Sequence, residues 1–291
     1  MPRRLASLLS ALVAALVVVG GASAPATAAA PAPTVRIAAA WMVKAQSATT
    51  LKGAVSSGSG HVAYLQVESG SSWSNLKTTR VTANGSKGAF AIRFVPRSGS
   101  HVYRVVVKKS GVARAVSNSL RIRTTTGSVY LAKARHYMRE YCPSTPMNAE
   151  LPKGGSLAGR ADTAWSWTGV YTSKGLKKTY TWKQKIRLQP GMPDATLRAV
   201  SLHECAHIVQ YRQLVKGESY LNKQIKATDK LHDGNGIEKQ ADCMTAVLLG
   251  TMRYAAYTDT CTSAQKKAAK ALWSTYGGKF QKSPYTFTRY E

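Results

Sequence analysis

The residues of this chain best suited to chemistry are the two histidines and the glutamate of His203-Glu204-Cys205-Ala206-His207. The segment has the pattern H-E-x-x-H. On a helix, side chains four positions apart share a face, so both imidazoles can reach one metal ion. Glu204 can then lie beside a water molecule on that metal and take its proton. The pattern predicts a catalytic Zn²⁺ site with His203 and His207 as ligands and Glu204 as general base.

The residues around the motif predict a buried helix that would hold it rigidly. Pro193-Asp194 is a helix-start signal, with Asp194 expected as the N-cap. Apolar residues then recur at helical spacing, at Leu197, Val200 (or Ala199), Leu202, Ala206 and Val209.

A catalytic zinc site needs a third protein ligand and one open position. The turn signal Asn235-Gly236 precedes a second predicted helix, on which Glu238 and Asp242 are four residues apart and project from the same side. One carboxylate can bind zinc, while the other accepts the free ring N–H of a ligand histidine. A solvated helix face would also carry such a pair, but this chain has only 13 Asp and Glu against 41 Lys and Arg. Spacing alone leaves open which carboxylate would be the ligand.

An H-E-x-x-H motif followed about thirty residues later by E-x-x-x-D resembles the gluzincin group of zinc peptidases. More narrowly, His203-Glu204-x-x-His207-x-x-Gln210 with Glu238-x-x-Ala241-Asp242-Cys243 resembles the bacterial neutral zinc metallopeptidase family. The apolar Ile237 and the upstream segment Tyr141-Cys142-Pro143 agree with it. The resemblance implies that Glu238 is the third ligand and that Asp242 orients a ligand histidine.

This resemblance covers roughly residues 128 to 276. It departs from the family at Cys205-Ala206, where an apolar residue and a glycine are usual, and it matches poorly from 144 to 175. Substrate specificity therefore does not follow from it. Position in the sequence makes His232 and Tyr211 candidate oxyanion donors, although His232 also fits an exposed turn.

The four cysteines, Cys142, Cys205, Cys243 and Cys261, predict two disulfides in an exported protein. Three pairings are possible. We favour Cys142–Cys205 with Cys243–Cys261, which would tie an upstream helix to the motif helix and the Glu238 helix to the last helix. The alternative, that Cys205 and Cys243 bind metal, is disfavoured because the Cys205 side chain points away from the histidine face of the helix.

Residues 1–30 have the features of a signal peptide: Arg3 and Arg4, an apolar run, and small residues up to a cleavage site near Ala26-Thr27-Ala28. We expect a secreted protein, extracellular or associated with the cell envelope, without a transmembrane segment after cleavage. The formal net charge of +28 is spread through the whole chain. It favours contact with anionic cell-wall polymer or a membrane surface over a specific nucleic acid partner. A solvated basic surface without a partner is the alternative that stays open.

Residues 35–124 predict an all-β domain. Alternating runs such as Val62–Val67, Phe90–Phe94 and Val102–Val107 are separated by Gly, Ser and Asn clusters, which is typical of a sandwich of about seven strands. The order Leu65-Gln66, Trp73, Phe90 and Tyr103-Arg104 resembles Ig-like repeats of secreted actinobacterial proteins. His61 and His101 are expected to be surface or turn residues.

Residues 128–291 predict the metallopeptidase domain. A helix with a Tyr130, Ala134, Tyr137 and Tyr141 stripe opens it, with His136 off the stripe and exposed. A strand is expected from Tyr180 to Leu188, and the resemblance to zincins implies that it edges the cleft. A helix from Ser263 to Tyr276 closes the domain. The fold class is therefore an Ig-like sandwich followed by a mainly helical α+β zincin-type domain.

The function predicted from these residues is a secreted zinc-dependent metallopeptidase acting on protein or peptide substrates. Two alternatives stay open. One is a non-catalytic, zinc-containing protein that binds the cell envelope. The other is a zinc amidase that acts on peptidoglycan peptides.

Overall fold

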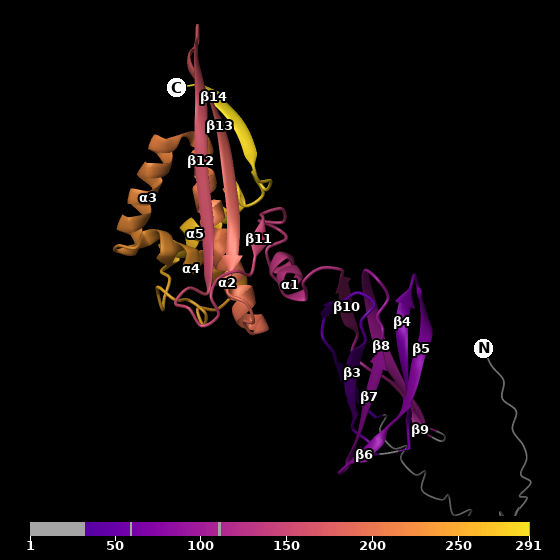
Figure 1. Ribbon diagram of the computed structural model, residues 1–291. Helices are drawn as coiled ribbons and strands as arrows, with labels where there is room; N and C mark the ends of the chain where they lie inside the picture. The colour runs from indigo at the N-terminus through magenta and orange to yellow at the C-terminus, as the bar shows by residue number, and fades with distance from the viewer. Residues whose placement is uncertain (1–32, 59, 110–111, 291) are drawn as a thin grey trace, which may run out of the picture.

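The computed structural model describes residues 33–58, 60–109 and 112–290, and the predicted signal peptide lies outside them. In Figure 1 a region made only of strands precedes a region of helices and strands. The chain is therefore an all-β region followed by an α+β region.

The N-terminal region contains, in the described residues, ten strands: β1 (Val35–Ala38), β2 (Met42–Lys44), β3 (Thr49–Val55), β4 (Val62–Ser69), β5 (Ser72–Arg80), β6 (Thr82–Asn84), β7 (Lys87–Phe94), β8 (Ser100–Lys109), β9 (Val112–Val116) and β10 (Leu120–Thr125). One sheet has the order β1-β3-β7-β6, and the other has the order β2-β10-β8-β4-β5 with β9 paired to β8. The β2–β10 pair is parallel, and the other pairs are antiparallel.

The alternation seen in the sequence explains how these two sheets pack. Along β4, Ala63, Leu65 and Val67 are buried while their neighbours are not. Phe90 and Ile92 of the opposite sheet belong to the same core. One apolar face from each sheet is thus removed from water, which makes a β-sandwich. This confirms the class of the predicted domain.

The C-terminal region contains the helices α1 (Val129–Tyr137), α2 (Asp194–Tyr211), α3 (Glu218–His232), α4 (Gly236–Leu249) and α5 (Ser263–Tyr276), with the 3₁₀ helix η1 (Arg212–Lys216). Its strands are β11 (Met147–Asn148), β12 (Gly159–Thr172), β13 (Gly175–Leu188) and β14 (Tyr285–Tyr290). The sheet order is β11-β13-β12, with β14 also paired to β13. Helices lie beside this sheet in Figure 1.

The strand predicted for 180–188 is part of β13, but it does not edge the cleft. β13 pairs with β11, β12 and β14, so its backbone groups are used inside the sheet. β12, whose residues show no clear strand pattern in the sequence, is the edge strand that contacts α2. The predicted placement of β13 is therefore wrong.

Asp194 is not the N-cap of α2. The cap residue is Pro193, and Asp194 is the first helical residue. Its carboxylate accepts hydrogen bonds from Trp41 Nε1 at 3.0 Å and Lys133 Nζ at 2.8 Å. Trp41 precedes β2 of the sandwich and Lys133 lies on α1, so this carboxylate joins the two regions instead of capping its own helix.

Three histidines predicted to be exposed are partly or fully removed from water. His61 is only 3% exposed, and His136 is half-buried because its ring lies 4.9 Å from that of Trp41. His101 lies in β8, with a ring nitrogen 2.8 Å from the Ser98 carbonyl. The tertiary contacts that bury these rings leave no periodic signal in the sequence.

The core of the C-terminal region surrounds α2. Leu197, Ile208 and Val209 are buried against apolar residues of α1, α4 and α5. Both predicted disulfides are formed: Cys142–Cys205 ties the segment after α1 to α2, and Cys243–Cys261 ties α4 to the residue two before α5. In the described residues no helix is long and apolar enough to cross a bilayer.

Candidate metal centre and its cleft

The two motif histidines lie one turn apart on α2, as the sequence predicts. Their ring centroids are 4.7 Å apart, and their Nε2 atoms are 3.1 Å apart. The helix can hold them rigidly because Cys205 and Ala206, between them, are fully buried. Cys205 takes part in a disulfide and therefore does not bind a metal.

Glu238, in the first turn of α4, completes the group. Its Oε2 lies 3.1 Å from the Nε2 atoms of both His203 and His207. Gly236 makes this start of α4 possible, since a Cβ atom there would lie 2.5 Å from the Thr228 carbonyl oxygen on α3. The Gly236 N–H donates to Asp229 Oδ1 at 2.8 Å. The close contact between α3 and α4 therefore sets where Glu238 lies.

Two acceptors fix the outer nitrogens of the histidine rings. Asp242 Oδ1 lies 3.0 Å from His203 Nδ1, and Gln210 Oε1 lies 2.9 Å from His207 Nδ1. The Gln210 amide is oriented because its Nε2 donates to the Ile237 carbonyl at 2.8 Å. Both Nδ1 atoms thus face acceptors and carry the proton, which leaves both Nε2 lone pairs pointing toward Glu238.

Charge interactions couple the members of this group to one another. Burial lowers the pKa of His203, but hydrogen bonds to Asp242 and Glu238 outweigh burial and raise that pKa to about 9. The two adjacent imidazoles hold the pKa of the Glu238 carboxyl far below its usual range. Two nitrogen lone pairs and a carboxylate oxygen meet within 4.8 Å. Such a donor set fits a divalent metal with three protein ligands.

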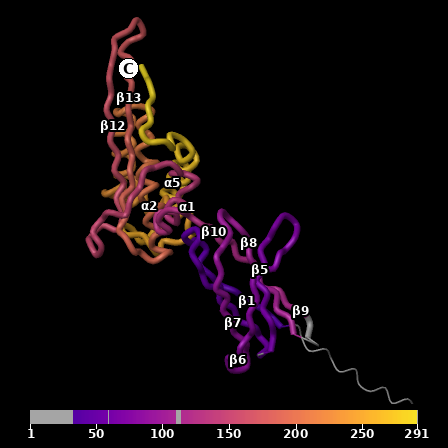
Figure 2. Tube along the Cα trace, turned by 45° about the vertical axis from the view of Figure 1, so that its right-hand side comes forward, coloured from indigo at the N-terminus to yellow at the C-terminus, as the bar shows by residue number. Residues whose placement is uncertain are grey.

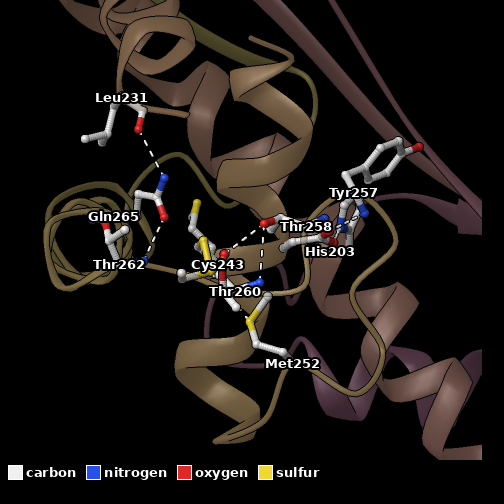
Figure 3. The surroundings of a disulfide bond; sticks show 12 residues. His203, Leu231, Cys243, Met252, Tyr257, Thr258, Thr260, Thr262 and Gln265 are labelled. Atoms are coloured by element: carbon white, nitrogen blue, oxygen red, sulfur yellow. Dashed lines mark hydrogen bonds and ion pairs between the residues drawn. A yellow bond between two sulfur atoms is a disulfide. The ribbon is translucent and has the colours of Figure 1, made fainter. Parts of the chain in front are cut away.

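Asp242 also holds a loop over the site. Its Oδ2 accepts from the backbone N–H groups of Ala256, Tyr257 and Thr258 at 3.0, 2.7 and 3.2 Å. The loop places the Tyr257 ring against the His203 ring, with centroids 5.8 Å apart and planes 23° apart (Figure 3). The Cys243–Cys261 disulfide secures both ends of this arrangement. Sequence reasoning missed Tyr257, because only the contacts of Asp242 bring it to the site.

Glu204 lies beside His203 on α2 and faces β12. A Cβ atom at Gly159 would come within 2.5 Å of Glu204 Oε1, so only glycine lets the strand approach this carboxylate. Burial raises the pKa of Glu204, while the charges of His203 and His207 and the Ala161 backbone N–H oppose that rise. The carboxylate is therefore both buried and more basic than usual, as a general base requires.

Two cavities have both His203 and Glu204 in their lining. The first, about 150 Å³, is lined mainly by apolar side chains that include Val200, Leu249 and Tyr254. The second, about 340 Å³, extends past His207 and Glu238 to Tyr211 and Arg160. Leu157, Gly159 and Tyr257 border both cavities. Together the two cavities form one cleft along the start of β12. The residues of the candidate site that line this cleft are His203, Glu204, His207, Glu238 and Asp242.

The two predicted oxyanion donors have different positions. Tyr211 lines the second cavity, with its ring 6.3 Å from that of Trp165 on β12. His232, at the end of α3, is buried and lines neither cavity of the cleft. Burial and the charge of Lys239 lower its pKa. The structure thus contradicts both predictions for His232, as an exposed turn residue and as a donor.

Comparisons with known proteins do not identify a family. No family model matches the chain, and no curated protein matches it. Solved structures that match include a CARDB domain from Pyrococcus furiosus, at 11% identity over 33% of this chain and 95% of that one, with a TM-score of 0.27. A fibronectin(III)-like module of CbhA from Clostridium thermocellum matches at 14% identity over 32% of this chain and 96% of that one, with a TM-score of 0.24. The assignment of a function therefore rests on the geometry of the site.

Proposed function

We propose that this chain is a secreted zinc-dependent metallopeptidase of the gluzincin group, with a zincin-type C-terminal domain. The observation that carries the proposal is the convergence of His203 Nε2, His207 Nε2 and Glu238 Oε2, with the outer nitrogen of each ring held by an acceptor. A chance cluster of polar residues has no need for outer acceptors that fix both tautomers. A metal site does need them, because a ligand must present a lone pair.

The three residues would hold Zn²⁺, for which two imidazoles and a carboxylate are a familiar catalytic ligand set. Zinc bound there would polarise the substrate carbonyl and lower the pKa of a water molecule in the cleft. Glu204 accepts a proton from that water as it attacks the carbonyl and then returns the proton to the leaving amine. Gly159 keeps β12 close enough to exclude bulk water around the Glu204 carboxylate.

The surroundings of the cleft indicate how a peptide would bind. β12 has a free edge at the cleft, since its other edge pairs with β13, and an extended peptide can add to such an edge. The first cavity would take an apolar side chain of moderate size. Its lining in the described residues includes neither Lys nor Arg, and Glu204 and Asp242 are its acids. Tyr257 and Tyr211 border the cleft and are the candidates for donating to the oxyanion.

Two further features support export. Both disulfides link cysteines of the domain that carries the cleft, which fits an oxidising compartment. The net charge of +28 favours retention at anionic cell-wall polymer. Protein or peptide would be the substrate, and no specific nucleic acid partner is proposed.

A non-catalytic role with structural zinc is less favoured. Structural sites are closed by four protein ligands, whereas the metal-ligating group here has three members and adjoins two cavities. A zinc amidase acting on peptidoglycan peptides would use the same ligands and base. Such an amidase would differ from the peptidase in its substrate, which the assays below distinguish.

The test compares Glu204→Gln with Glu150→Gln, which makes the same chemical change at an exposed acid outside the cleft. Each protein is loaded with zinc, its zinc content is measured, and hydrolysis of casein, a peptide library and purified cell wall is followed. We expect Glu204→Gln to keep its zinc and to lose about 10²- to 10⁴-fold in turnover, because an amide cannot accept the proton.

Glu150→Gln should behave as wild type. Near-normal hydrolysis by Glu204→Gln would make another residue the base. Release of stem peptides without cleavage of casein or library peptides would favour the amidase. Inactivity of wild type on all three substrates would favour the envelope-binding protein.

A further inference from the structure

The β12–β13 hairpin extends beyond the helices at the end opposite the cleft. Figures 1 and 2, two views 45° apart, both show the hairpin tip beyond the helices. Pairing continues to Thr172↔Gly175, so the tip turns through Ser173 and Lys174. Trp165 on β12 contacts the helices, since its Nε1 donates to Glu218 Oε1 on α3 at 3.0 Å. At about 3.3 Å per residue, the tip lies roughly 23 Å beyond Trp165.

The tip exposes large apolar side chains. Tyr171 is 84% exposed, Val170 67% and Trp167 45%, within nine consecutive exposed residues from 166 to 174. Register places Tyr171 opposite the partly buried Leu176 and Val170 opposite Lys177, so apolar residues occupy both faces of the tip. Single exposed apolar residues are ordinary. A group of them at the end of a projecting hairpin marks a contact surface.

The charged side chains of the hairpin from residue 163 onward all have one sign, and Arg289, paired with Lys178 from β14, has the same sign. Lys174 and Lys177 are exposed at the turn, and Lys178 Nζ lies 4.2 Å from the centre of the Trp167 ring. From 163 to 193 the sequence contains neither Asp nor Glu. A surface that complements the tip must therefore be anionic and must also accept apolar side chains. Lipid bilayers with acidic headgroups offer both, whereas a hydrated anionic polymer offers only the charge.

We propose that the hairpin tip, residues 166–178, docks on anionic lipid membranes. Val170 and Tyr171 enter the boundary between headgroups and acyl chains, Trp167 lies at headgroup level, and the lysines contact the acidic headgroups. The cleft borders the other end of the same hairpin at Gly159, which is 13 residues from Thr172. At about 3.3 Å per residue, a docked tip would hold the cleft roughly 43 Å from the membrane surface. Docking is independent of the proposed peptidase activity.

The test uses the full mature chain with vesicles of phosphatidylcholine alone or with 30 mol% phosphatidylglycerol. We expect co-sedimentation with the acidic vesicles. Val170→Ser/Tyr171→Ser should reduce binding at least tenfold, and Lys174→Gln/Lys177→Gln by roughly fivefold per lysine. The matched controls are Leu76→Ser/Val95→Ser and Lys52→Gln/Lys87→Gln, which make the same kinds of change at exposed positions of the sandwich.

A second measurement does not depend on a binding variant. Lipids that carry a quencher on the acyl chain should reduce tryptophan fluorescence of wild type, and Trp167→Phe should abolish most of that quenching. If the sandwich control variants lost as much vesicle binding as the tip variants, binding would be due to the overall charge of the protein and not to the tip. Binding that is insensitive to Val170→Ser/Tyr171→Ser, or a soluble anionic polymer that binds the tip as tightly as the vesicles, would overturn the proposal in favour of a polymer contact.

Discussion

The sandwich and the C-terminal region bury different kinds of side chain. Of the fourteen buried polar or charged side chains in the described residues, thirteen follow residue 128, and His61 is the one in the sandwich. Arg212, fully buried, donates to the carbonyls of Tyr276 and Gly277 at the end of α5. Burial lowers its pKa to about 10.

Buried polar groups cost free energy unless they are fully hydrogen-bonded. In the C-terminal region many of these groups are hydrogen-bonded to one another in networks. The hydrogen bonds around His203 and His207 form one such network. The sandwich needs no such network, because alternating apolar residues account for its core. The difference is one of construction: in the described residues, buried polar groups are concentrated in the region that also carries the candidate metal centre.

The largest expected effect is a difference in zinc affinity between variants of the two carboxylates on α4, Glu238 and Asp242. Glu238→Ala removes the atom that lies 3.1 Å from both Nε2 atoms and should nearly abolish zinc binding under mild chelation. Asp242→Ala leaves the three ligands in place but frees His203 Nδ1, so affinity should fall by about 10- to 100-fold.

Competitive zinc titrations of both variants give these affinities. Asp242→Ala should also speed hydrogen exchange at the amides of Ala256, Tyr257 and Thr258, which lose their acceptor. The reverse order of affinities would exchange the two assignments.

A substitution at Gly159 tests whether β12 must approach Glu204 closely. The added methyl group of Gly159→Ala would meet Glu204 Oε1 at 2.5 Å and Val200 Cγ1 at 2.6 Å, so strand or carboxylate must move. We expect kcat to fall by about 10²-fold with zinc content unchanged, the size of loss that misplacing a catalytic group by about 1 Å produces. Gly278→Ala, where no atom lies within 4 Å, is the control. Unchanged kcat in Gly159→Ala would show that this approach is dispensable.

A cavity in the sandwich core tests whether the two regions are independent. Leu65 is fully buried, and Leu65→Ala should lower the free energy of unfolding of the sandwich by about 2–5 kcal/mol. The cleft is lined by residues 156 and beyond, so hydrolysis at 25 °C should stay within about twofold of wild type. Differential scanning calorimetry and peptide assays check both statements. A parallel loss of activity would mean that the sandwich shapes the cleft.

The smallest effect concerns the junction at Asp194. Burial raises the pKa of this carboxyl, but hydrogen bonds from Lys133 and Trp41 outweigh burial and hold it below its usual value. Its contribution is therefore present above the unfolded pKa of about 4 and is lost as pH falls through the folded pKa. Because the side chain is 43% exposed, Asp194→Asn should cost no more than about 1 kcal/mol at pH 7, and less as pH approaches 3.

Urea unfolding at several pH values measures this cost, with the exposed Asp259→Asn as control. A cost for Asp194→Asn that grows on acidification would contradict the assigned direction of the pKa shift.

The periodic parts of the structure could be predicted from the sequence. The helix expected from Ser263 to Tyr276 matches α5, and the turn signal Asn235-Gly236 marks the start of α4. The spacing within H-E-x-x-H sufficed to place His203 and His207 together. Each of these features is determined by residues close together in the sequence, so the sequence pattern alone indicates it.

Features set by tertiary contacts could not be predicted. β12 has exposed residues on both faces beyond Trp165, so it lacks the alternation that marks a half-buried strand. α3, which was not predicted, buries only Leu221, Thr228 and His232 along its length. Tyr257 reaches the site because Asp242, fifteen residues earlier, binds its N–H. Spacing within a sequence does not encode such contacts.

The most direct test of the account is the zinc content of the purified mature protein after dialysis against a weak chelator. Wild type should hold about one zinc per chain, and His203→Ala/His207→Ala should hold none. The control His101→Ala/His136→Ala removes two histidines that are outside the metal-ligating group and should keep the metal. One zinc per chain in His203→Ala/His207→Ala, or none in wild type loaded with excess zinc, would contradict the assignment of this site.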